Sequence, residues 1–151
     1  MQSATPLRTA LAAFALAALL SSCSRTPPEQ QLRDTVATLQ TAVETRDVGA
    51  LKKVLADDFV GTEGLDRDGA TRLAQLMFLQ HRDVGVSLGP LRLQLSPQPA
   101  ADHATVHFTA ALTGGSGTGL PDSARLYEVE TGWRLEGGNW RLTSVTWTPQ
   151  L

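Results

Sequence analysis

The chain has 151 residues, of which 42% are hydrophobic, and 13 Lys and Arg face 15 Asp and Glu for a formal net charge of −2. Its length suits a single domain. The charges are interspersed without a basic block, and nucleic-acid binding needs Lys and Arg clustered on one face, so we expect no nucleic-acid partner.

The first segment is apolar and ends at the only cysteine of the chain. Arg8 is its single charged residue, residues 9–20 carry no charge, and Ser21-Ser22 precede Cys23. The run has the length of a signal-peptide core and falls short of the roughly 20 residues that span a bilayer. A lone cysteine forms no internal disulfide. An ordinary secretory signal that leaves a free thiol is the alternative to a lipid-attachment signal.

Residues 1–22 resemble a bacterial lipoprotein signal peptide, with Cys23 at the position that receives lipid. The resemblance implies a thioether-linked diacylglyceryl group, cleavage before Cys23 and an added acyl chain such as palmitate. Several acyl chains together make a stable membrane anchor, which one chain does not. Position 24 is Ser, not the Asp that favours inner-membrane retention in such lipoproteins. We therefore expect the periplasmic face of the outer membrane, with residues 23–30 as a polar, proline-containing tether and residues 31–149 as the folded domain.

Three helices are predicted after the tether. The first runs from about Glu29 to Arg46, where apolar residues recur at spacings of four, three and four. Asp47 is the expected N-cap of a second, short helix ending near Ala56, and a short strand should follow it. Asp66 opens the turn that caps a third helix, predicted over residues 70–82.

Beyond residue 82 the apolar period changes to two, which predicts an antiparallel sheet with one covered face. Residues 136–139, Glu-Gly-Gly-Asn, indicate a hairpin turn. In the last strand Trp140 and Leu142 share a phase, whereas Val145 and Trp147 lie on the other one. A bulge near Thr143 or Ser144 would restore one phase; alternatively, both faces of this strand are covered, for instance by a second subunit. Residues 114–119 are rich in glycine and are predicted to be a hairpin connection.

Helices followed by strands predict an α+β fold. Two segments carry a family resemblance: residues 39–61, LQTAVETRDVGALKKVLADDFVG, and residues 137–147, GGNWRLTSVTW. They resemble the nuclear-transport-factor-2-like superfamily in its SnoaL-like bacterial branch, and the resemblance covers residues 31–148. It implies a cone in which three N-terminal helices pack on a curved antiparallel sheet around a pocket. The superfamily includes isomerases, cyclases, dehydratases and non-catalytic proteins, so the fold does not decide the activity.

Five residues are candidates for the pocket: Glu63, Asp58, His81, Tyr127 and Trp133. Each also has a plainer structural interpretation. Glu63 lies before the third helix and can face either the cavity or solvent. Asp58 follows the second helix, where a carboxylate commonly caps or forms an ion pair. His81 can simply cap the third helix, and the two aromatic residues can simply be core.

Acid–base chemistry of the ketosteroid isomerase type needs a base and a donor inside an apolar pocket. The only tyrosine lies on a strand, and the stripe of the first helix carries no Tyr, His or carboxylate, so this pattern is not matched. The three histidines lack metal-ligand spacing, and no Gly-x-Ser-x-Gly motif is present. We therefore predict no catalytic residues, no metal and no cofactor.

The sequence favours a cell-envelope lipoprotein whose domain binds a small apolar ligand or serves assembly. The alternatives are a SnoaL-like isomerase, cyclase or dehydratase, and a structural module that forms homodimers through the open face of the sheet. An enzyme requires at least two convergent polar groups in the cavity. A ligand-binding domain needs an open apolar cavity, and a structural module predicts a filled one.

Overall fold

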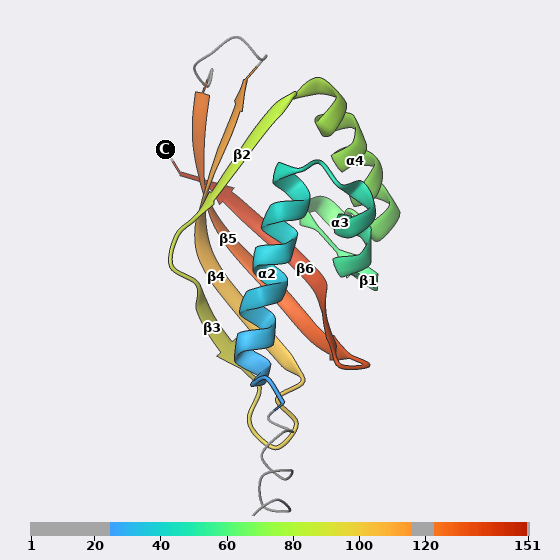
Figure 1. The fold of residues 1–151 in the computed structure, drawn as a ribbon, viewed down its shortest axis with the longest axis vertical. Coiled ribbons are helices and arrows are strands. Elements are labelled where there is room, and N and C mark those ends of the chain that lie inside the picture. The colour runs from blue at the N-terminus through green and yellow to red at the C-terminus, as the bar shows by residue number, and fades with distance from the viewer. Residues whose placement is uncertain (1–24, 116–122, 151) are drawn as a thin grey trace, which may run out of the picture.

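Three helices precede most of the sheet in the computed structural model, which describes residues 25–115 and 123–150. In chain order the elements are α2 Pro28–Glu44, α3 Val48–Val54, β1 Leu55–Val60, the 3₁₀ turn η2 Thr62–Gly64, α4 Arg67–Gln80, β2 Asp83–Leu88, β3 Arg92–Leu95, β4 His103–Gly115, β5 Ser123–Glu136 and β6 Asn139–Pro149. Figure 1 shows α2 lying across the concave side of the curved sheet, with α3 and α4 beyond the β1–β6 edge. The predicted α+β arrangement is confirmed.

The two predicted N-cap residues, Asp47 and Asp66, stand at the starts of α3 and α4. The Asp47 carboxylate accepts a hydrogen bond of 2.9 Å from the Ala50 amide at the start of α3. The Asp66 carboxylate accepts one of 2.7 Å from the Gly69 amide, and α4 begins at Arg67, three residues before the expected start. These side chains satisfy amides that have no partner within the helix, so each helix begins where the short polar residue stands.

The first helix begins inside the segment that we expected to be tether, residues 23–30. Pro28 is the first residue of α2, and its carbonyl accepts a hydrogen bond of 3.0 Å from the Trp140 indole of β6. Proline suits this position because its missing amide has no helical partner to lose. Among the residues that the structure describes, regular secondary structure therefore starts at Pro28.

The sheet has the strand order β1-β6-β5-β4-β2, with β3 also pairing with β4. All pairs are antiparallel except β1 with β6, which are parallel through Leu55 beside Leu142 and Val60 beside Ser144. The expectation of a wholly antiparallel sheet was therefore wrong at this edge. Alternating polarity shows which face of a strand is covered, but it carries no information on strand direction.

A bulge in β6 places all of its apolar residues on one face. Opposite β6, Trp133 pairs with Leu142, whereas the preceding Gly132 pairs with Ser144, so Thr143 is the extra residue. The apolar phase changes across Thr143, which brings Val145 to the same concave face as Leu142. This confirms the predicted bulge and removes the need for a second subunit over the other face of this strand.

The part of the core without a cavity lies next to the N-terminal half of α2. Leu32 and Val106 are fully buried, and Trp133 is 2% exposed and donates a hydrogen bond of 2.8 Å from its indole nitrogen to the Thr131 hydroxyl. Thr131 in turn donates to the Val106 carbonyl at 3.1 Å. Trp133 therefore belongs to the solid core and does not line any of the cavities described below.

The segment after Cys23 carries a complete core. The buried cluster and the residues packed on it run from Leu32 to Val145. The helices and strands that the structure describes lie between Pro28 and Pro149. We therefore expect residues 24–151 to fold without the leader. Within residues 25–115 and 123–150, none of the helices combines the length and the apolar composition needed to cross a bilayer.

Candidate functional site

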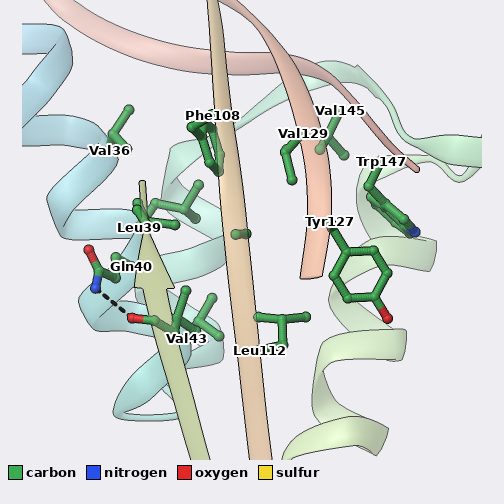
Figure 2. A pocket seen from close by; sticks show the side chains of 13 residues that line it. Val36, Leu39, Gln40, Val43, Phe108, Leu112, Tyr127, Val129, Val145 and Trp147 are labelled. Carbon is green, nitrogen blue, oxygen red and sulfur yellow. Dashed lines mark hydrogen bonds between the residues drawn. The ribbon is translucent and has the colours of Figure 1, made fainter. Parts of the chain in front are cut away.

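The main pocket lies between α2 and the concave face of the sheet and has a volume of about 430 Å³ (Figure 2). Small-molecule sites commonly have volumes of roughly 300–1,000 Å³. The lining residues come from α2, four strands of the sheet and no loop: Val36, Leu39, Gln40, Val43, Val86, Leu88, Phe108, Ala110, Leu112, Tyr127, Val129, Val145 and Trp147. The alternating strands and the helix stripe predicted from the sequence supply this wall.

Only two polar side chains reach the main pocket apart from the indole N–H of Trp147. The Gln40 amide donates a hydrogen bond of 2.7 Å to the Val86 carbonyl, and a second one of 3.2 Å to Glu44 at the end of α2. Because this amide is occupied by the protein, it serves to hold α2 on β2. Figure 2 shows the hydroxyl of Tyr127 at the end of the pocket away from Val36 and Phe108.

A second cavity, of about 440 Å³, adjoins the main pocket and shares Val43, Leu112 and Tyr127 with it. Its other walls come from the end of α4 and the adjacent strand ends, and they include His81 and Arg125. His81 is the C-cap of α4, where its backbone N–H donates to the Met77 carbonyl at 2.9 Å. We call this space the outer cavity.

Glu63 lies at a third cavity, of about 530 Å³, on the other side of Trp147. This cavity is formed mainly by η2 and the start of α4, and Arg72 and Asp66 share it with Glu63. The Glu63 backbone has a φ of 61°, in the left-handed region that non-glycine residues seldom adopt. The structure thus separates Glu63 from His81 and Tyr127, which line the outer cavity.

Asp58 lies outside these cavities, in an ion pair. Its two carboxylate oxygens accept hydrogen bonds of 2.9 and 3.0 Å from the Arg134 guanidinium, which also pairs with Glu136. The bidentate bond from Arg134 holds the pKa of the Asp58 carboxyl below its ordinary value of 3.8. Asp58 therefore joins β1 to β5 across the intervening strand, in agreement with its plainer interpretation.

Arg125, Trp147 and Gln40 line these cavities and were not among the candidates taken from the sequence. Arg125 lies two positions before Tyr127 on β5, so strand alternation was a usable signal for it. Trp147 could be assigned to the pocket face only once the position of the bulge in β6 was known. Gln40 lies on the flank of the predicted stripe of α2, and nothing in the sequence indicates its bond to β2. Within the described ranges, no group of three His, Cys, Asp or Glu side chains is arranged to hold a metal ion.

Comparisons with known proteins identify the fold through solved structures. No family model and no curated protein sequence matches this chain. Bd1075 of Bdellovibrio bacteriovorus aligns with a TM-score of 0.70 at 12% identity, over 80% of this chain and 41% of its own. An NTF2-like protein of unknown function from Pseudomonas putida aligns with 0.66 at 19% identity, over 80% and 84%. A proposed dehydratase of the NTF2-like family from Streptomyces avermitilis aligns with 0.69 at 19% identity, over 81% and 95%.

The chain has the cone fold of the NTF2-like proteins, as its two sequence motifs indicated. It spans less than half the length of Bd1075 and most of the length of the other two proteins. At identities below 20% these similarities establish the fold alone. The activity must therefore be inferred from the cavity itself.

Proposed function

We propose that this chain is a cell-envelope lipoprotein whose domain binds a small apolar ligand in the main pocket, without catalysis. One observation carries the binding role: a cavity of about 430 Å³ whose wall is aliphatic and aromatic except for Gln40 and the polar ends of Tyr127 and Trp147. An apolar ligand gains roughly 25 cal/mol for each Å² of apolar surface that it removes from water there. A purely structural module would fill this space with its own side chains.

The proposed location in the cell envelope is inferred from the leader sequence. Residues 20–23, Leu-Ser-Ser-Cys, have the pattern of a lipid-attachment site, and Ser24 follows them. Four residues, 24–27, separate the cysteine from the first residue of α2, which makes five steps from one Cα atom to the next. Such a tether spans at most about 18 Å. The domain would thus remain close to the membrane surface to which Cys23 is attached.

The binding role is tested by filling the pocket. Ala110 lines it at the centre of β4, whereas the adjacent Ala111 points to the opposite face of the same strand. We expect residues 24–151 to bind the neutral dye Nile red with one site per chain. Ala110→Phe should weaken binding at least about tenfold by occupying the cavity. Ala111→Phe is the matched control and should bind as the unmodified domain does.

The readout is dye fluorescence, with thermal unfolding as a check that both variants are folded. If the unmodified domain does not bind Nile red, the proposed function is wrong. If both phenylalanine variants bind equally well, the dye occupies some other place and the main pocket is not the site.

An acid–base enzyme is the second candidate, because the outer cavity brings the His81 ring and Tyr127 to one space. A histidine and a phenol can serve as base and acid in an elimination of water. The Streptomyces avermitilis protein of this fold is described as a proposed dehydratase. The two candidates differ in the fate of the ligand. A ligand extracted from the cell envelope with the protein should return unchanged after incubation if the protein only binds, and should lose one water if the protein is a dehydratase.

A further inference from the structure

We propose that the ligand is amphipathic: an unbranched alkyl chain lying in the main pocket, with a terminal carboxylate held in the outer cavity by Arg125 and His81. This inference rests on the proposed function and specifies its ligand class. It follows from the walls that the two adjacent cavities share and from the basic side chains that line the outer cavity.

The two cavities are adjacent, and one is apolar whereas the other has polar groups in its wall. They share three wall residues, Val43, Leu112 and Tyr127. On the inner side of these residues the walls are almost wholly apolar. On the outer side the polar groups are the Tyr127 hydroxyl, Thr113, His81 and Arg125. A ligand that fills both volumes must therefore have one apolar part and one polar end.

The polar end carries two basic side chains and no carboxylate among the residues that the structure describes. Among the lining residues of both cavities that the structure describes, the ionisable ones are His81, Arg125 and Tyr127, and no Asp or Glu is among them. A guanidinium presents paired N–H donors that match the two oxygens of a carboxylate. An alkyl cation would meet like charge in the same place.

The backbone directs both basic side chains into the outer cavity. Arg125 pairs across the sheet with Leu112 and shares the concave face of β5 with Tyr127. His81 lies over Gly114 of β4, where a Cβ atom would stand 3.6 Å from the imidazole Nδ1. That separation is an ordinary van der Waals contact, so the His81 ring lies against β4, and His81, Gly114 and Arg125 line the same cavity.

Among the residues that the structure describes, two acidic side chains on the elements around these cavities are not part of their walls. Asp83 follows His81 by two residues, but β2 alternates and it is Val84 that lines the outer cavity. Glu44 at the end of α2 accepts the second Gln40 hydrogen bond and is not part of either wall. Arg82 is exposed and also does not line the cavities, which makes it a useful control.

The experiment displaces Nile red from residues 24–151 with three probes of equal chain length, each below its micellar concentration: dodecanoate, 1-dodecanol and dodecyltrimethylammonium. We expect dodecanoate to bind about tenfold more tightly than the alcohol and the cation to bind most weakly. Arg125→Gln should lower the affinity for dodecanoate far more than the affinity for 1-dodecanol and so remove the preference for dodecanoate. Arg82→Gln removes the same charge near the same opening and should retain the preference.

The outcomes separate this inference from the function on which it depends. If Nile red binds and the three probes displace it equally, the apolar site stands and the carboxylate assignment is wrong. If Arg125→Gln and Arg82→Gln reduce the preference for dodecanoate equally, the preference is a general effect of net charge. That result would also overturn the carboxylate assignment. Dodecyl phosphate is then measured in the same way as a fourth probe, and tighter binding of it than of dodecanoate would reject carboxylate as the terminal group. Absence of Nile red binding would reject the proposed function itself.

Discussion

At the scale of single residues, Asp58 shows how a carboxylate next to a predicted pocket can have a structural role. It lies on β1, and its bidentate partner Arg134 lies on β5, with β6 between them. The Arg134 guanidinium lowers the pKa of the Asp58 carboxyl by hydrogen bonding to its charged form. Because both groups are accessible to water, the effect of the pair on stability should be modest and dependent on salt.

The lowered pKa of Asp58 predicts a pH dependence of stability. A carboxyl whose folded pKa lies below its unfolded value stabilises the fold above the unfolded pKa, and this contribution disappears as the pH falls through the folded pKa. We therefore expect Asp58→Asn to be less stable than the unmodified domain at pH 7, and the difference to shrink as the pH falls below about 4. Urea unfolding at a series of pH values measures it.

The control for this prediction is Asp34→Asn. Asp34 is exposed on α2 and accepts a hydrogen bond from the Gln30 amide, four residues earlier. Its replacement should change the free energy of unfolding by less than about 0.5 kcal/mol. A difference between Asp58→Asn and the unmodified domain that stays constant from pH 7 to pH 3 would contradict the role given to the Asp58–Arg134 pair.

At the scale of elements, α2 and α4 have similar apolar spacing but different packing. In α2, Leu32 is fully buried and Val36 is 3% exposed. In α4, Leu76 is 51% exposed and Leu79 is 83% exposed. Figure 1 shows the reason: α2 crosses the concave face of the sheet, whereas α4 lies beside the β1 edge. Periodicity predicts which residues of a helix share a face, but not whether that face meets the core.

This difference predicts unequal costs for the same substitution. Leu32→Ala should lower the free energy of unfolding by about 2–5 kcal/mol, since it removes buried methyl groups and leaves a cavity. Leu76→Ala in α4 should cost less than about 1 kcal/mol, because half of that side chain already contacts solvent. Chemical denaturation of the two variants measures both values. Equal costs would mean that the leucine face of α4 is covered in solution.

The sequence-based prediction of the elements succeeded where one local rule applied. The caps Asp47 and Asp66 and the bulge at Thr143 follow from side-chain chemistry and from strand alternation, and the structure has all three. The direction of β1 could not be predicted, because it depends on which edge of the sheet remains open to a strand that lies about 80 residues before β6 in the chain. Of the predicted glycine-rich connection, residues 114–119, the first two residues end β4 and residues 116–119 lie outside the described residues.

At the scale of the whole molecule, the existence of the pocket was easier to predict than the set of residues that line it. The family motifs and the apolar strand faces indicate a cone with an apolar interior, and Tyr127 was placed on the inner face by alternation. Trp133 has the same phase but lies in the closed part of the core. The separation between solid core and open pocket depends on how far α2 stands from the sheet along its length, which no local pattern contains.

Pro28, where the chain that follows the proposed anchor enters α2, and the polar end of the cavities lie at opposite ends of this helix. The tether joins α2 at Pro28, and Val43, which lines both cavities, lies near the other end of this 17-residue helix. At 1.5 Å per residue these two positions are about 22 Å apart. Figure 1 shows the start of α2 near β3 and its end near α4. A lipid at Cys23 would therefore hold the domain by the end farther from Arg125 and His81.

The attachment itself is a prediction about processing. From cells, the unmodified chain should be recovered in the membrane fraction beginning at Cys23, with diacylglyceryl and acyl groups on that residue. Cys23→Ala should carry no lipid and should retain residues 1–22, because processing of such leaders follows lipid attachment. Mass spectrometry of the N-terminal peptide measures both features, and Ser24→Ala is the matched control, which should still be lipidated. An unmodified thiol at Cys23 on a protein released from the membrane would leave the ligand pocket intact as a proposal but would remove the anchor.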